Sequence, residues 1–138
     1  MRKKLLTIML IICMILTLLP VYSIAATEDP FTDVSSSDYY YKAVNYVYEN
    51  DLMKGIGNDK FAPNQTVSRG MILTTLYRLE GTPAVVNSMF TDVAADAYYA
   101  DAIAWSAQNN IVLGYGNGKF GPEDSVTREQ LAAILYRY

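Results

Sequence analysis

The chain has 138 residues, 11 of them basic and 14 acidic, with a single cysteine, no histidine and a formal net charge of −3. Without histidine it lacks the commonest general base, the usual partner of a Ser or Cys nucleophile, and the nitrogen ligand most often found on zinc. These absences argue against most hydrolases and zinc proteins and leave open only catalysis by carboxylates.

The N-terminal segment predicts export. Three basic residues at positions 2–4 precede an uncharged run of 15 residues (5–19), and small residues follow at 23–26. This pattern predicts a signal peptide over 1–26, cleaved after Ala25 or Ala26. The run is shorter than the roughly 20 residues that a spanning helix needs, and an uncleaved anchor is the alternative. Cys13 lies within the run, so the mature chain would have no thiol.

Removal of this segment changes the charge of the protein. Three of the 11 basic residues lie in it, so the remainder carries 8 basic against 14 acidic side chains, a net charge of −6. Such a surface repels nucleic acid and anionic membranes. We therefore expect neither a nucleic acid nor, after cleavage, a membrane as the partner.

An internal repeat follows, with a constant offset of 59 residues. Phe31-Thr32-Asp33-Val34 recurs as Phe90-Thr91-Asp92-Val93, and the offset then holds to the end of the chain. Further matched pairs are Tyr39 and Tyr98, Ala43 and Ala102, Tyr46 and Trp105, Gly57 and Gly116, Phe61 and Phe120, Arg69 and Arg128, and Arg78 and Arg137. The chain therefore contains two copies of one unit, predicted as 27–83 and 84–138.

Each unit is predicted to contain two helices. The first runs over 40–50 and 99–109, with an inward face of Ala43, Val44 and Val47, or Ala102, Ile103 and Ser106. Tyr46 and Trp105 are expected to pack. A Gly-x-Gly-Asn-x-Lys-Phe stretch predicts a tight turn. The second helix begins after Val67 and Val126, with a capping box at Thr127–Gln130 and only a Ser68 cap in the first copy. One unit of about fifty residues buries little apolar surface, so the copies should share a core.

The second copy resembles the S-layer homology module of bacterial surface proteins almost throughout. The matching residues are Phe90, Asp92, Val93, Tyr98, Ala102, Ile103, Ile111, Gly114, Gly118, Phe120, Pro122 and Thr127-Arg128-Glu129. The resemblance implies a mostly α fold of tandem helix–loop–helix repeats, part of a three-pronged pseudo-symmetric spindle. It also implies a secreted, non-enzymatic protein, without a cofactor, held on a Gram-positive-type cell wall by secondary cell-wall polysaccharide, often through a pyruvylated sugar.

The sequence departs from the family pattern. It has two repeats instead of three, tyrosine in place of the usual tryptophan, and Arg69-Gly70-Met71 or Arg128-Glu129-Gln130 in place of Arg-Ala-Glu. A partial chain would account for the number of repeats. A third repeat or other chains with such repeats are therefore possible partners, while the glycan, the organism and any cargo are not specified.

Two arginines are the first candidate ligands. Arg69 and Arg128 stand at the start of the second helices, where a cation faces the positive end of the helix dipole. An arginine fork beside free helix N–H groups suits a carboxylate such as that of a pyruvate ketal. The alternative is a surface arginine paired with a nearby Asp or Glu.

The remaining candidates come in pairs. Asp33 and Asp92 could accept hydrogen bonds from sugar hydroxyls or could instead serve in turns. Tyr39 and Tyr98 could offer a flat face to a sugar ring or could belong to the core. Gly57 and Gly116 are expected in turns, where the missing side chain would let a sugar approach the backbone.

Three other functions compete with polysaccharide binding. A wall hydrolase would need two carboxylates across a cleft, which two short repeats do not suggest. A calcium-binding module would need an Asp-rich loop, which 114–119 lacks. A self-assembling structural surface protein is the strongest alternative.

Overall fold

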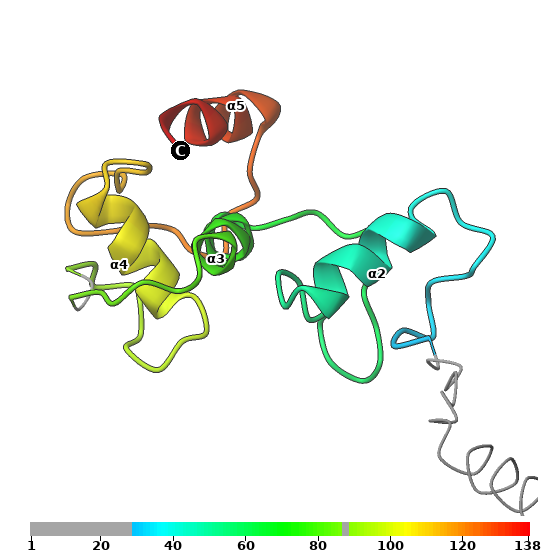
Figure 1. Ribbon diagram of the computed structural model, residues 1–138. Helices are drawn as coiled ribbons and strands as arrows, with labels where there is room; N and C mark the ends of the chain where they lie inside the picture. Colours follow the sequence, from blue (N-terminus) through cyan, green and yellow to red (C-terminus); the bar gives the residue numbers. More distant parts are fainter. Residues whose placement is uncertain (1–28, 87–88) are drawn as a thin grey trace, which may run out of the picture.

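The computed structural model describes residues 29–86 and 89–138, and the predicted signal peptide lies outside them. The described part is mostly α, as predicted. It contains four helices, α2 (Tyr41–Glu49), α3 (Arg69–Leu79), α4 (Ala100–Gln108) and α5 (Arg128–Arg137), and isolated β-bridges instead of strands (Figure 1). Each predicted first helix is confirmed to within one residue at either end.

The second helices begin as their sequences predict. The Ser68 hydroxyl accepts a hydrogen bond from the Met71 N–H at the start of α3. At the start of α5, Thr127 and Gln130 form the complete capping box, each side chain bonded to the other's backbone N–H. The side chains thus satisfy helix N–H groups that have no partner within the helix.

The first helices end in the same way in both repeats. The Asn50 and Asn109 side chains donate to the carbonyl oxygens of Tyr46 and Trp105, each at 2.8 Å. The next residues, Asp51 and Asn110, both have a φ of 57°. Asp and Asn tolerate this left-handed conformation better than most residues, so the helix stops here in each copy.

The Gly-Asn turns are confirmed. The Lys60 N–H donates to the Gly57 carbonyl and the Lys119 N–H to the Gly116 carbonyl, each at 3.1 Å. Gly57 has a φ of 91° and Gly116 one of 88°. Glycine adopts these angles without a steric cost, so the turn residues match the geometry that they must adopt.

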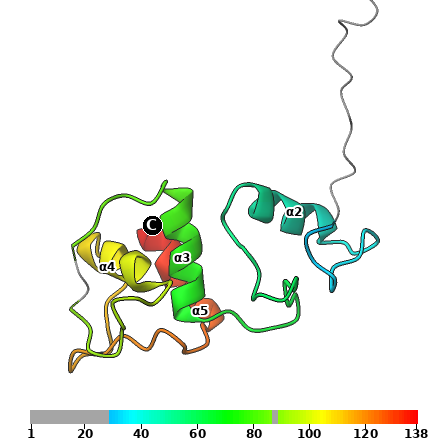
Figure 2. The same cartoon turned by 90° about the horizontal axis from the view of Figure 1, so that it is seen from below.

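The two repeats share one core, as expected. Helix α3 of the first repeat packs on α4 of the second, and the two views agree on this pairing (Figures 1 and 2). The buried residues of this core are Leu73, Leu76, Val93, Ala100, Ala102, Ile103, Trp105, Ile111, Val112, Phe120 and Ile134. The repeat in the sequence is therefore not the packing unit, because its second helix completes the core of the next repeat.

Helix α2 has a much smaller core of its own. Only Phe31, Val34 and Val44 are buried there. The prediction that Ala43 faces inward is wrong, because Ala43 is exposed, and Val47 is only half-buried. The prediction for the second repeat is confirmed: Ala102, Ile103 and Ser106 are buried. The reason is tertiary: α4 has α3 beside it, and no helix of the described residues lies in the same place beside α2.

Candidate functional site

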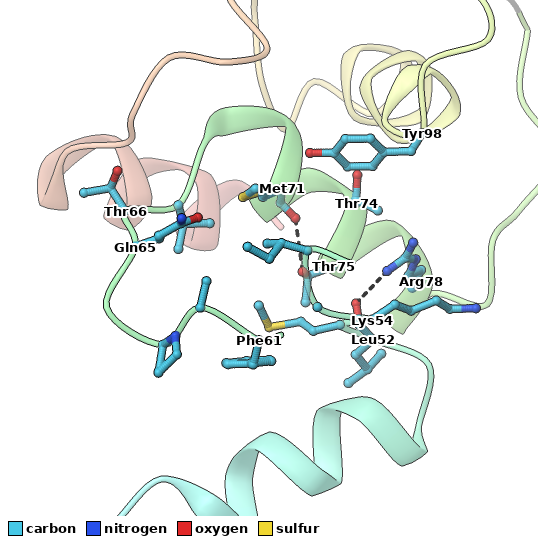
Figure 3. Close-up of a pocket in the computed structure, with 16 residues that line it drawn as sticks. Leu52, Lys54, Phe61, Gln65, Thr66, Met71, Thr74, Thr75, Arg78 and Tyr98 are labelled. Atoms are coloured by element: carbon cyan, nitrogen blue, oxygen red, sulfur yellow. Dashed lines mark hydrogen bonds between the residues drawn. The ribbon is translucent and has the colours of Figure 1, made fainter. Parts of the chain in front are cut away.

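A pocket of about 470 Å³ lies in the first repeat, at its border with the second (Figure 3). One wall is the loop that follows α2, through residues 52–56, 61–63 and 65–67. Another wall is α3, through Met71, Thr74, Thr75 and Arg78, and Tyr98 of the second repeat borders it. The pocket is therefore formed mainly by the first repeat, and Tyr98 is the lining residue that the second repeat contributes.

Polar and aromatic groups are mixed on these walls. The Arg78 Nη1 donates to the Leu52 carbonyl at 3.1 Å, which ties the loop to α3. The Thr74 and Thr75 hydroxyls donate to the carbonyls of Gly70 and Met71. Phe61 adds an apolar ring. Flat apolar surface next to hydroxyl and guanidinium groups is the combination that a sugar ring can use.

Tyr98 keeps a neutral hydroxyl at this pocket. Partial burial, together with the negative charge of Glu123, raises the pKa of the Tyr98 hydroxyl above its ordinary value of 10. The side chain lies over Thr74 in Figure 3 and is still exposed. It can thus both present its ring and donate a hydrogen bond at neutral pH.

Arg69 has a different environment from the one that either sequence interpretation assumed. It is only 5% exposed, and its Nε and Nη2 donate to the carbonyls of Phe120 and Leu113, each at 3.2 Å. Its guanidinium carbon lies 4.7 Å from the Tyr115 ring centre and 4.6 Å from that of Phe120. The alternative of a surface arginine paired with a carboxylate is therefore wrong for this residue.

The backbone N–H groups at the start of α3 are likewise hydrogen-bonded to the second repeat. The Arg69 N–H donates to the Asp124 carbonyl at 2.9 Å and the Gly70 N–H to the Pro122 carbonyl at 2.8 Å. Backbone oxygens of the other repeat thus occupy the helix N–H groups that an anion would use. Arg69 joins the repeats in this structure.

Arg128 occupies the equivalent position on α5 but is exposed. Within residues 29–86 and 89–138 it makes no side-chain hydrogen bond, ion pair or ring contact. Of the two predicted arginines, this is the one whose guanidinium is available to a ligand.

Asp33 and Asp92 both hold the loops of their own repeats. Asp33 accepts hydrogen bonds from the N–H groups of Phe61 and Ala62, each at 2.9 Å. Asp92 accepts them from Phe120 and Gly121 at the same distance. The Phe61 bond lowers the pKa of the Asp33 carboxyl, and for Asp92 the Gly121 and Phe120 bonds outweigh the opposing effect of burial and also lower the pKa.

The remaining predicted residues lie on the surface. Tyr39 is almost wholly exposed and does not line the pocket, although it is the repeat partner of Tyr98. Gly57 and Gly116 are exposed in the turns, and a Cβ built on either would meet no atom within 4 Å. The structure therefore brings only Tyr98 of the predicted residues to the pocket.

The pocket residue that sequence reasoning missed is Arg78. The signal was available, because Arg78 recurs as Arg137 in the repeat alignment. Two further findings concern only the described ranges. They contain no group of three or more acidic side chains placed to hold a metal, and none of their helices is long and apolar enough to cross a membrane.

Comparison with known proteins identifies the repeats. The family model described as the S-layer homology domain matches residues 30–70 and 90–132, one match to each repeat. This domain is a non-catalytic anchoring domain of the cell wall.

Curated relatives include surface proteins and an endoglucanase. The chain is 34% identical over 118 residues to the "Surface-layer 125 kDa protein" of Lysinibacillus sphaericus, covering 86% of this chain and 10% of that protein. It is 31% identical to an "Endoglucanase" of Bacillus sp. (strain KSM-635), covering 98% of this chain and 15% of that one. A "Cell surface protein" of Thermoanaerobacter kivui is 28% identical, with 98% and 18% covered. The chain spans less than a fifth of the length of these relatives, and the matches place it at the bacterial cell surface.

Proposed function

The chain belongs to the S-layer homology family, and on that premise we propose that it attaches to the bacterial cell wall by non-covalent binding of secondary cell-wall polysaccharide. The role is binding and not catalysis. The polysaccharide is proposed to carry an anionic sugar such as a pyruvate ketal, which offers both a ring face and a carboxylate.

The observation that supports this proposal most directly is the composition of the pocket that α3, the loop after α2 and Tyr98 line. Tyr98 offers a ring and a hydroxyl beside Thr74, and Thr75 and Arg78 line the same α3 wall. Lys54, which is paired with Asp51 at 3.0 Å on the surface, adds a second cation at the rim. A carboxylated sugar can stack on the tyrosine while its carboxylate pairs with these cations.

The residues predicted to contact the sugar do not all have the same place in this proposal. Arg128 stays a proposed carboxylate contact because its guanidinium is exposed. Arg69 is not required as a sugar ligand, since its donors are used between the repeats. Asp33, Asp92, Tyr39, Gly57 and Gly116 stay predictions as direct sugar contacts, and their lack of a place in this pocket makes them secondary to Tyr98.

The test is a pull-down of the full chain, exported by a Gram-positive host, on cell-wall sacculi with and without their secondary polysaccharide. We expect binding only when the polysaccharide is present. Tyr98→Ala should weaken it by about tenfold or more, as the loss of a stacked aromatic contact does. Tyr39→Ala is the matched control, because it removes the same side chain from the equivalent position outside the pocket.

The outcomes separate the parts of the proposal. Equal binding to stripped sacculi would overturn polysaccharide recognition. Equal losses for Tyr98→Ala and Tyr39→Ala would leave the polysaccharide as ligand but would exclude this pocket as its site.

A further inference from the structure

The contact that joins the two repeats has two halves, and the 59-residue repeat provides each half twice. One half is the start and inner face of α3, with Arg69. The other half is α4 with the loop that carries Leu113 and Phe120. Within the described residues these two halves meet once, where α3 packs on α4. Helix α5 therefore carries a second copy of the α3 half, and α2 with its loop carries a second copy of the α4 half.

The residues of α5 that correspond to the inner face of α3 are exposed. Leu76 on α3 is 8% exposed, whereas its repeat partner Leu135 on α5 is 53% exposed. Tyr77 is half-buried against Trp105, whereas its partner Tyr136 is 92% exposed. An apolar helix face of this kind is normally covered by another element.

The residues of α2 that correspond to the buried face of α4 are exposed as well. Trp105 on α4 is 8% exposed, whereas its partner Tyr46 on α2 is 61% exposed. Ala102 is buried and its partner Ala43 is exposed. Since both faces are exposed in the same chain, α2 and α5 do not cover each other.

The first repeat also has an unfilled site for an arginine. Arg69 binds the carbonyls of Leu113 and Phe120, and the residues at the same places in the first repeat are Lys54 and Phe61. Phe61 keeps the aromatic ring, while Ile56 replaces Tyr115. Lys54, Ile56 and Phe61 all line the pocket described above, so the space that Arg69 fills in the second repeat is open in the first.

We propose that a second copy of this chain fills the open arginine site of the first repeat. Arg128 and the exposed face of α5 in one copy dock on the Lys54–Phe61 loop and on α2 of the next, which repeats between chains the contact that α3 makes with α4 inside one chain. The occupant follows from continuity with that contact, because a second copy of this chain carries the same arginine and the same helix face. The contact is head-to-tail, because α5 of one copy meets α2 of the next.

One position makes the contact between chains weaker than the one within the chain. A Cβ on Gly70 would lie 2.9 Å from Cδ1 of Tyr99 and 3.1 Å from the Pro122 carbonyl oxygen. The equivalent residue on α5 is Glu129, which has a Cβ and a charged side chain. The docked helix must therefore sit slightly farther away, and the association depends on protein concentration.

The test is sedimentation velocity of the full chain, exported by a Gram-positive host, over a wide range of concentrations and without polysaccharide. Because the docked arginine would occupy the Lys54–Phe61 side of the pocket, omitting polysaccharide keeps the result independent of the function proposed above. We expect the sedimentation coefficient to rise with concentration. Arg128→Ala should raise the dissociation constant by about tenfold or more, since it removes a cation held by carbonyls and a ring.

Matched variants distinguish this contact from unspecific aggregation. Arg137→Ala removes the same charge from the same helix at the repeat partner of Arg78, which contacts its own repeat, and should leave the dissociation constant unchanged. Glu129→Gly and Ile56→Tyr should each tighten association, because they restore the residue types of the α3–α4 contact. A chain that stays monomeric throughout, Glu129→Gly included, would overturn the proposal, as would equal effects of Arg128→Ala and Arg137→Ala.

Discussion

The Arg69 side chain donates from its Nε to the carbonyl oxygen of Phe120, 51 residues farther along the chain, at 3.2 Å. The same guanidinium lies 4.6 Å from the centre of the Phe120 ring. One arginine thus connects the start of α3 to the loop of the next repeat by both a hydrogen bond and a cation–π contact. This contact holds the two repeats in a shared core.

Arg69→Ala should lower the free energy of unfolding by about 2–4 kcal/mol. The substitution leaves two carbonyl oxygens of the second repeat without their donor and opens space beside two rings. Urea denaturation followed by circular dichroism, at low protein concentration, measures the change. Arg128→Ala is the control at the equivalent, exposed position and should stay within about 0.5 kcal/mol of the parent chain. A similar loss in both variants would contradict the joining role of Arg69.

Stability should fall in acid because of Asp33 and Asp92. Backbone N–H bonds lower the pKa of both carboxyls in the folded chain. A lowered folded pKa stabilises the protein at pH values above the unfolded pKa of about 4, and this stabilisation is lost as the pH falls through the folded value. The melting temperature should therefore change little between pH 7 and 5 and fall below about pH 4.

The acid effect can be assigned by substitution. Asp33→Asn and Asp92→Asn should each lower stability at pH 7 and reduce its dependence on pH below 4, because the amide cannot ionise. Asp96→Asn is the control, since Asp96 is an exposed aspartate that makes none of these loop bonds. An unchanged acid profile in both loop variants would show that other groups control it.

Two neighbouring glycines should respond differently to alanine. A Cβ on Gly114 would lie 2.5 Å from the Lys119 carbonyl oxygen and 2.5 Å from Cε1 of Phe90, so Gly114→Ala forces the loop apart and should cost about 2–4 kcal/mol. A Cβ on Gly116 would meet no atom within 4 Å, so Gly116→Ala should lower the free energy of unfolding by only about 1 kcal/mol, because of the φ of 88°. Thermal unfolding of the two variants measures the order, and the reverse order would contradict the loop geometry.

The capping box should contribute measurably to α5. Thr127→Ala removes the acceptor of the Gln130 N–H and should lower the free energy of unfolding by about 1 kcal/mol. Thr127→Ser keeps the hydroxyl and should stay close to the parent chain. Chemical denaturation compares the two, and equal losses would indicate that the threonine methyl group, and not the cap, is responsible.

The local structure of this protein could be predicted from its sequence alone. Helix ends, the Gly57 and Gly116 turns and the Thr127 box depend on residues within a few positions of one another, so a single sequence was enough to place them. The 59-residue offset also revealed the repeat and, with it, the shared core. These features follow from backbone conformational preferences and short-range hydrogen bonds.

The role of each copy of a repeated residue depends instead on its tertiary contacts. Arg69 is buried and Arg128 is exposed, and Tyr98 borders a pocket while Tyr39 does not, although the members of each pair stand at equivalent positions of the repeat. Their difference comes from neighbours far away in the chain: α3 has the next repeat against it, and α5 has no equivalent partner among the described residues. Burial depends on these long-range contacts, which a local pattern does not encode.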